Sequence, residues 1–288
     1  MTSSVGIKPA LTHQEMISLF KDRGMIIEDE EKAIEVLTRV SYYRFTGYDL
    51  TFKKDNKYAE GTTFEKIHRH YEFDKSLRLM LMELIEYIEI SIRTQLTYMI
   101  AHDYPDLGYR DPHNFVNEEK HQRLLEILDN ELNKSNELFV KHHRENRNGV
   151  FPVWVALEMA TFSNLVELHK NLRTDDQIKI SNQYNLHNTV LKNWLIILKI
   201  LRNRCAHHSR LFNSLIITKP KILRTDKHLD LQEHHLYTQI FNMKYLIKDH
   251  TLWNSWVTRL EALIEQYDDV DINRMGFKKK WSTLLKTV

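Results

Sequence analysis

The feature that most restricts the fold of this 288-residue chain is a long helical pattern of apolar residues between positions 62 and about 102. Thr62 and Glu65 have the spacing of a capping box, which predicts where the helix starts. The pattern does not decide whether this helix is interrupted near Phe73. The apolar side chains recur at steps of three and four, which places them on one face of a core helix: Leu77, Met80, Leu81, Leu84, Ile85, Ile88, Ile92 and Leu96.

Shorter segments of the chain repeat this helical pattern. Only 7 Gly and 5 Pro are present, whereas sheet-rich folds need many turn residues, so the scarcity favours helices. No internal repeat and no low-complexity linker is visible. We therefore predict an all-α fold in a single compact domain spanning residues 1–288, with further helices at about 12–22, 29–41, 117–145, 152–172, 175–183, 188–207, 231–248 and 251–267.

The single cysteine and the hydropathy pattern limit the cellular setting. One cysteine, Cys205, excludes a disulfide framework and a multi-cysteine zinc site, and we expect it to be a small buried helix residue. The first fourteen residues lack the continuous apolar core of a signal peptide. The apolar run Leu195–Leu201 is interrupted by Lys199 and is too short to span a bilayer. We expect a cytoplasmic protein without a membrane contact.

Charge is distributed unevenly although the formal net charge is only +2. From Gln177 to Thr225 there is no Asp or Glu. Such a stretch is either a chance run on a solvated face or a surface that faces phosphate. It carries these cations: Lys179, Lys192, Lys199, Arg202, Arg204, Arg210, Lys219, Lys221 and Arg224.

The segment 202–210, RNRCAHHSR, holds the candidate chemistry. On a helix, Arg202 and His207 differ by about 7.5 Å in height and about 140° in direction, whereas Asn203 and His207 share a face. RNA carries its own nucleophile in the 2′-hydroxyl; a histidine can move protons at neutral pH, and an arginine can stabilise the charged phosphorane. The trio therefore suits RNA cleavage without a metal. The alternative is a basic helix end that caps its own carbonyls.

This segment resembles the R-x4-6-H motif of the HEPN superfamily of helical ribonucleases, including the Asn beside the Arg. Over residues 10–285 the chain resembles the Abi-like family of bacterial abortive-infection proteins of the AbiD/AbiF type. The resemblance rests on ordered blocks: Tyr42-Tyr43-Arg44-Phe45-Thr46-Gly47-Tyr48, Phe73-Asp74-Lys75-Ser76-Leu77-Arg78, Glu89-Ile90-Ser91-Ile92-Arg93, Pro152-Val153-Trp154-Val155-Ala156-Leu157-Glu158, Arg202-Asn203 with His207-His208-Ser209-Arg210-Leu211-Phe212-Asn213, and Met275-Gly276-Phe277 with Trp281.

The resemblance implies a HEPN-like helical bundle with additional helices and a toxin-like ribonuclease that halts growth during phage infection. Such enzymes generally pair two motifs in one composite site. Since residues 188–213 carry the one clear copy, the resemblance implies a homodimer in which Arg202 and His207 of both protomers meet. It also implies RNA as substrate and a small structured non-coding RNA as regulatory partner. No cofactor is expected.

Other residues are assigned supporting roles. Glu89 and Arg93 are four apart in the favoured acid-before-base order, and with His208 they are interpreted as support for the site. The aromatic turn around Tyr43 and Arg44 either grips RNA by stacking and phosphate contacts or packs in the core. The residues predicted to bind RNA are Lys192, Lys199, Arg204, Arg210, Lys219, Lys221, Arg224, Arg44 and Tyr43.

Two other functions compete with RNA cleavage. One is an RNA-binding or RNA-sensing HEPN protein that does not cut. The other is a metal-dependent phosphohydrolase, suggested by the dipeptide His102-Asp103, although about one such pair is expected by chance. Adjacent histidines on a helix point about 100° apart and rarely share one ion, so no metal site is expected.

Overall fold

The computed structural model describes residues 9–105 and 107–286, and the regular secondary structure of this part is almost wholly helical. The all-α prediction is confirmed. The α-helices are α1 (His13–Asp22), α2 (Glu30–Arg39), α3 (Tyr42–Thr46), α4 (Phe64–Asp103), α5 (Glu118–Lys134), α6 (Leu138–Asn146), α7 (Val153–Ala156), α8 (Phe162–Asn171), α9 (Thr174–Asn182), α10 (Asn188–Ala206), α11 (Leu236–Met243), α12 (His250–Gln266) and α13 (Trp281–Lys286).

Short elements complete the described part. An antiparallel hairpin pairs β1 (Lys53–Lys54) with β2 (Lys57–Tyr58), a feature that the sequence pattern did not predict. The single-turn 3-10 helices are η1 (Gly108–Arg110), η2 (Pro112–Asn114), η3 (Leu157–Met159), η4 (Lys227–Leu229) and η5 (Ile272–Met275). Within the described ranges, none of the helices combines the length and the apolar character needed to cross a bilayer. The prediction that no signal peptide is present concerns residues that lie largely in 1–8, outside these ranges, and the single-domain organisation stays a prediction.

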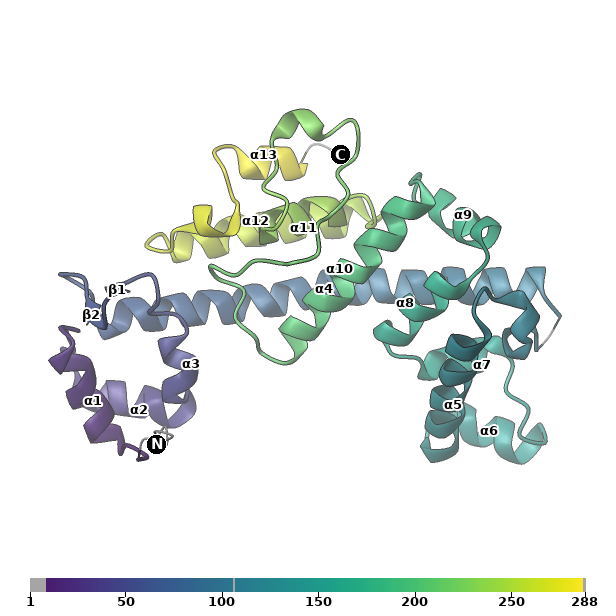
Figure 1. Ribbon diagram of the computed structural model, residues 1–288, viewed down its shortest axis with the longest axis horizontal. Coiled ribbons are helices and arrows are strands. Elements are labelled where there is room, and N and C mark those ends of the chain that lie inside the picture. Colours follow the sequence, from purple (N-terminus) through teal and green to yellow (C-terminus); the bar gives the residue numbers. More distant parts are fainter. Residues whose placement is uncertain (1–8, 106, 287–288) are drawn as a thin grey trace, which may run out of the picture.

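Helix α4 runs along the whole molecule as a continuous helix of 40 residues (Figure 1). It is about 60 Å long and has no break at Phe73, which is fully buried. The predicted capping box is wrong by one residue: the hydroxyl of Thr63, not Thr62, accepts the cap hydrogen bond, from the amide of Lys66 at 3.1 Å. Thr62 is buried, and its carbonyl accepts from Ile26 N at 2.9 Å. The segment that contains Ile26 bonds the chain just before α4 and therefore determines the residue at which α4 begins.

The other helices gather in three groups along α4 (Figure 1). Helices α1–α3 lie at its amino end, where the stacked rings of Phe45 and Phe64 have centroids 4.3 Å apart. Helices α5–α9 surround its carboxyl end. Helix α12 lies along its amino-terminal half, where the Trp256 indole donates to the carbonyl of Met80 at 2.8 Å.

Two predicted helices are each divided in the structure, and in both cases an arginine takes the freed carbonyls. The predicted helix 117–145 is split into α5 and α6, and Arg144 donates to carbonyls at the end of α5, including that of Leu132 at 2.7 Å. The predicted helix 152–172 is split into α7, η3 and α8, and Arg93 donates to the carbonyls of Leu157 and Ala160. Both breaks depend on residues distant in sequence, so local periodicity does not reveal them.

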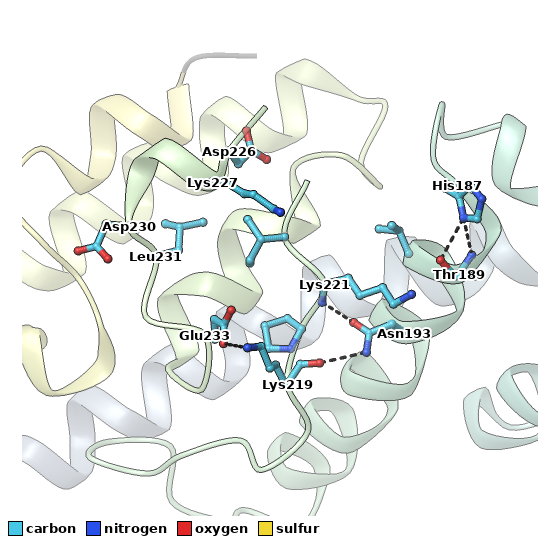
Figure 2. Close-up of a pocket in the computed structure, with 13 residues that line it drawn as sticks. His187, Thr189, Asn193, Lys219, Lys221, Asp226, Lys227, Asp230, Leu231 and Glu233 are labelled. Carbon is cyan, nitrogen blue, oxygen red and sulfur yellow. Dashed lines mark hydrogen bonds and ion pairs between the residues drawn. The ribbon is translucent and has the colours of Figure 1, made fainter. Parts of the chain in front are cut away.

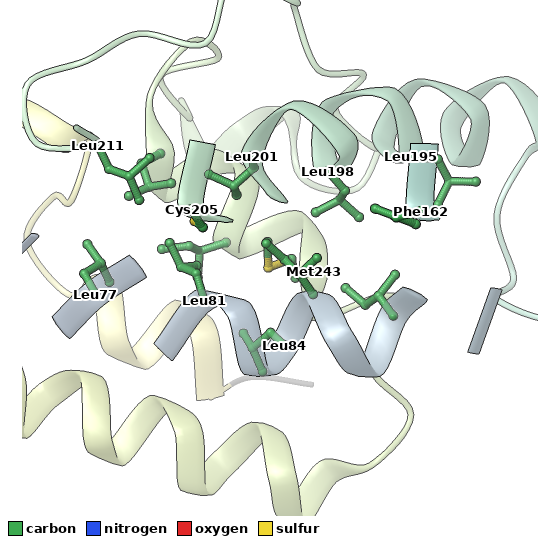
Figure 3. Packing of buried hydrophobic residues seen from close by; sticks show 14 of the residues in the cluster. Leu77, Leu81, Leu84, Phe162, Leu195, Leu198, Leu201, Cys205, Leu211 and Met243 are labelled. Carbon is green, nitrogen blue, oxygen red and sulfur yellow. The ribbon is translucent and has the colours of Figure 1, made fainter. Parts of the chain in front are cut away.

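Helix α10 crosses α4 near its middle and carries the motif residues (Figure 1). Figure 3 shows its apolar face packed against α4, with Met243 of α11 beside the contact. The interface aligns the last turns of α10 with one stretch of α4, and Cys205 is buried within it as predicted. The facing side chains are Leu195, Leu198, Leu201 and Cys205 from α10, and Leu77 and Leu81 from α4.

The Asp74 carboxylate fixes the chain where it leaves α10. Its Oδ1 accepts from the backbone amides of Leu211 at 3.0 Å and Phe212 at 2.6 Å. Its Oδ2 accepts from the Tyr48 hydroxyl at 2.6 Å and from the Arg78 guanidinium. Asp74 is 0% exposed and Arg78 only 4%, so the charge pair is desolvated but fully bonded. One side chain thus joins the segment after α3, helix α4 and the loop that follows the motif.

Replacing Asp74 tests how much of the fold depends on this contact. Asp74→Ala leaves a buried guanidinium and two buried amides without their acceptor, so we expect the free energy of unfolding to fall by about 3–5 kcal/mol. Urea denaturation followed by circular dichroism measures it. Asp22→Ala, which removes an exposed carboxylate from the end of α1, is the control and should change stability by less than about 0.5 kcal/mol. Equal stability of the two variants would contradict the role of Asp74.

Candidate active site

Helix α10 ends in a turn that holds His208 in the left-handed region, with φ of +57°. The amide of His208 donates to the carbonyl of Cys205 at 3.1 Å, and that of Ser209 donates to the carbonyl of Arg204 at 2.8 Å. This pair of bonds is the Schellman termination of a helix, in which glycine usually occupies the position of His208. His207 is the C-cap residue and its side chain is exposed.

Two arginines clasp this turn to the α3 segment. The Arg44 guanidinium donates to the carbonyl of His208, and the Arg210 guanidinium donates to the carbonyl of Gly47. A third, Arg204, donates to Ser214 Oγ at 3.1 Å and to the carbonyl of Leu215 at 3.0 Å. Arg44, Arg204 and Arg210 thus hold the backbone around the motif, and their predicted contact with RNA stays a prediction.

The motif residues Arg202, Asn203 and His207 have a different status. In the part of the chain that the structure describes, none of their side chains makes a hydrogen bond or an ion pair. The Nε atom of Arg202 is buried without a partner, which is costly for a donor. The fold therefore uses the basic neighbours of the trio but leaves the trio itself available.

Arg202 lies beside Glu89, the acid predicted to support the site. It lines a groove of about 490 Å³ on α4, together with Leu79, Ile90 and Glu89. Half-burial raises the pKa of the Glu89 carboxyl, while the positive charges of Arg93 and Arg202 act in the opposite direction. Arg93 donates to Glu89 Oε1 at 3.1 Å and also holds the carbonyls before α8. Glu89 thus connects a structural arginine to the motif arginine.

The angular mismatch between Arg202 and His207 persists in the folded chain. Arg202 faces the α4 groove, and His207, exposed at the helix end, is not among the residues that line this groove. One protomer does not place the two side chains on one surface. Asn203 lies one turn before His207, and its carbonyl accepts from the His207 amide at 2.9 Å.

Acids from other parts of the chain neutralise some cations of the acid-free stretch. Lys199 forms an ion pair with Glu167 at 2.9 Å, and Lys219 with Glu233 at 2.8 Å. Lys192 is half-buried near His169, whose pKa is lowered to about 4 by burial and by the Lys192 charge.

Among the remaining residues predicted to bind RNA, three are exposed. Lys221 and Arg224 form no ion pair with any described residue. The side chain of Tyr43 is 89% exposed, although Phe45 and Tyr48 of the same aromatic turn are in the core. Phe45 and Tyr48 therefore pack in the core, which is one of the two roles considered for this turn. Tyr43 points to solvent, as the other role, contact with RNA, would require.

A metal-dependent phosphohydrolase would need several metal-ligating side chains close together. Within residues 9–105 and 107–286, no three or more His, Cys, Asp or Glu side chains are grouped to hold an ion. The His102 Nδ1 atom is 2.7 Å from the carbonyl of Tyr98, and Asp103 pairs with Lys179 at 2.8 Å. The HD dipeptide is thus accounted for by local contacts on the surface.

Sequence reasoning missed the residues that hold the motif in place, namely Tyr48, Asp74 and Arg78. A signal was present, because Asp74 and Arg78 are four apart in a strongly apolar helix, as Glu89 and Arg93 are. An acid and a base so spaced on a buried face must pair. The backbone partners of Asp74 lie more than a hundred residues away, however, and no local pattern indicates them.

The positive φ at position 208 gives a testable consequence for stability. A β-branched residue is strained in the left-handed region, so His208→Val should be less stable than His208→Gly by about 1–2 kcal/mol. Chemical denaturation of both variants measures the difference. The order should reverse at His142, inside α6, where glycine is the poorer helix former. If His208→Val matches His208→Gly, the turn does not hold this conformation.

A comparison with protein families finds one that spans the site. The model of the family described as Abi-like protein matches residues 35–213. This range contains α3, Asp74, Glu89 and the motif, and thus both sides of the clasp. Neither the curated proteins nor the solved structures yielded a match. Since the family match covers more than half of the chain, the protein belongs to the Abi-like family, and this membership indicates a part in abortive-infection defence against phage.

Proposed function

We propose that this protein is a metal-independent endoribonuclease toxin of the HEPN type, acting in abortive infection. The observation that carries the proposal is the division of roles in the motif segment. Arg204 and Arg210 are bound to backbone carbonyls, whereas the side chains of Arg202, Asn203 and His207 make no hydrogen bond or ion pair within the described residues. A fold that needed a basic helix end only for capping would engage all of them.

The chemistry follows from the three side chains. The RNA 2′-hydroxyl attacks the adjacent phosphorus while a His207 imidazole accepts its proton. The Arg202 guanidinium stabilises the charge on the phosphorane oxygens, and the Asn203 amide orients the phosphate by donating a hydrogen bond. The bond to the 5′ oxygen then breaks, and an imidazolium returns a proton to that oxygen. The products are a 2′,3′-cyclic phosphate and a 5′-hydroxyl.

A second copy of the chain would complete the site. Arg202 and His207 do not share a surface in one protomer, so a composite site needs the two motifs to face each other. Two exposed apolar side chains flank the Arg202 groove: Leu79 is 67% exposed and Ile90 is 54% exposed. Exposed apolar residues beside a polar functional group are typical of an interface. We include the homodimer in the proposal for this reason.

The proposal keeps RNA as substrate and a structured non-coding RNA as regulator. The exposed or half-buried residues available for phosphate and base contacts are Lys192, Lys221, Arg224 and Tyr43. Phosphate contacts of this kind make binding salt-dependent, with a slope that reports the number of cations used. Fewer cations remain free than the sequence alone indicates, so a shallow salt dependence is expected.

The direct test is RNA cleavage in EDTA. Purified protein should cut total RNA and leave 2′,3′-cyclic phosphate ends. Arg202→Ala/His207→Ala should cut at least about 100-fold more slowly, because it removes a proton-transfer group and a charge stabiliser. Fragment length by electrophoresis and end-group analysis provide the measurement.

Arg147→Ala/His250→Ala is the matched control, since it removes the same two residue types from exposed positions elsewhere. It should cleave as the wild type does. A requirement for divalent metal, or full activity of the motif variant, would refute the mechanism. A discrete copurifying RNA without any cleavage would favour the alternative of an RNA-binding protein that does not cut.

Sedimentation tests the dimer. Leu79→Glu/Ile90→Glu places two charges at the proposed interface and should convert a dimer to a monomer while RNA cleavage is lost. Leu138→Glu/Ile217→Glu, at side chains 83% and 89% exposed on other elements, should remain dimeric and active. A wild-type protein that is monomeric at concentrations where it cleaves RNA would contradict the composite site.

A further inference from the structure

A cavity of about 850 Å³ lies at the other end of α10 from the motif. Figure 2 shows it between the first turns of α10 and the segment 219–233. From Val190, which lines it, to His207 the helix rises about 25 Å. The cavity is thus a separate place on the molecule, and the chemical steps proposed for cleavage do not use it, although Lys221 is also one of the cations available for RNA contacts.

The wall of this cavity is fixed by hydrogen bonds to α10. The Asn193 side chain donates to the carbonyl of Lys219 at 3.1 Å and accepts from the amide of Lys221 at 2.7 Å (Figure 2). The buried indole of Trp194 donates to the carbonyl of Lys221 at 2.7 Å. Both the amide and the carbonyl of Lys221 are therefore bonded to α10, and the Cα atom from which its side chain extends is held in place.

The acids that line the cavity are already engaged. Asp226 is buried and accepts from the Tyr245 hydroxyl at 2.8 Å. Asp230 pairs with Lys278 at 2.6 Å, and Glu233 pairs with Lys219 at 2.8 Å. All three carboxylates therefore bond groups other than the two remaining cavity lysines, although the Tyr245 hydroxyl does not neutralise the charge of Asp226.

Those two lysines, Lys221 and Lys227, have no acid among the described residues bonded to them. Within the described ranges neither forms an ion pair or a side-chain hydrogen bond, and no dashed line reaches either ammonium group in Figure 2. The amino end of α10 opens on the same cavity, where His187 is the N-cap, and it adds partial positive charge. An anionic group is the complement of free ammonium groups in a cavity that a helix amino terminus also lines.

The remaining lining is apolar: Val190, Pro220, Ile222 and Leu231. A free inorganic anion has no use for such a surface, whereas a nucleotide presents a flat base beside its phosphate. We propose that this cavity binds one nucleotide, with its phosphate at Lys221 and Lys227 and its base against the apolar wall. The nucleotide is either free or a terminal residue of an RNA. The proposal goes beyond the ribonuclease function and does not depend on it.

Isothermal titration calorimetry at low salt tests the proposal with AMP, UMP, adenosine and inorganic phosphate. AMP or UMP should bind the full-length protein at one saturable site per chain, and adenosine should bind much more weakly because it lacks the phosphate. Lys221→Gln/Lys227→Gln should weaken nucleotide binding at least about tenfold, since two charged contacts are lost. Unchanged thermal unfolding of this variant would show that its fold is intact.

Lys54→Gln/Lys57→Gln, which changes two exposed lysines of the hairpin, is the matched control and should leave the affinity unchanged. A 2′-O-methyl octauridylate, which cannot be cleaved at its 2′ positions, separates the two sources: competition with UMP indicates that an RNA end enters the cavity, and its absence indicates a free nucleotide. Lack of saturable nucleotide binding, equal affinity of the cavity variant, or binding of the octamer alone would overturn the proposal. RNA cleavage is not measured, so this outcome is independent of the ribonuclease.

Discussion

The contact on which the structure around the motif depends is the buried carboxylate of Asp74. Its two oxygen atoms accept hydrogen bonds from Tyr48, Arg78 and the amides of Leu211 and Phe212. Because a desolvated charge must be fully bonded to be tolerated, the four donors are held in one arrangement. The loop after α10 is thereby fixed on α4. A helix end that contains a non-glycine residue at positive φ needs such support from its surroundings.

This anchoring explains why the basic residues of the segment divide into two kinds. Arg44 and Arg210 can act as a clasp only because the Asp74 contact brings α3 and the motif turn together. Arg202 instead lies in a groove lined by acids, an unfavourable setting for RNA if those acids were free. Glu83 is paired with Arg259 at 2.6 Å, and Glu89 is balanced by arginines on two sides. The third acid of the groove, Glu86, has no ion pair within the described residues, so the groove repels phosphate less than three free acids would.

Periodicity was sufficient to predict the all-α class, the long helix α4 and the helix that carries the motif, because these depend on a local apolar pattern. The predicted helix boundaries were wrong where residues distant in sequence determine them. The Ile26 amide bonds the carbonyl of Thr62 at the start of α4, and Arg93 bonds the carbonyl of Ala160 before α8. Motif spacing identified the trio, but it could not separate free cations from engaged ones. The acid-free stretch was counted along the chain, whereas Glu167 and Glu233 approach it only in space.

Helix α10 links the motif and the nucleotide cavity as one rigid element. The chain after the motif returns along α10 and is bonded to it at both ends, by Arg204 near residue 215 and by Asn193 and Trp194 near residue 220. A ligand at Lys221 therefore meets a wall that is already ordered, and binding does not require this wall to move. Signals between distant sites need an element with two arrangements, whereas the bonds along this path hold the described residues in one arrangement. We infer that a nucleotide in the cavity, whether free or at an RNA end, binds without rearranging the motif.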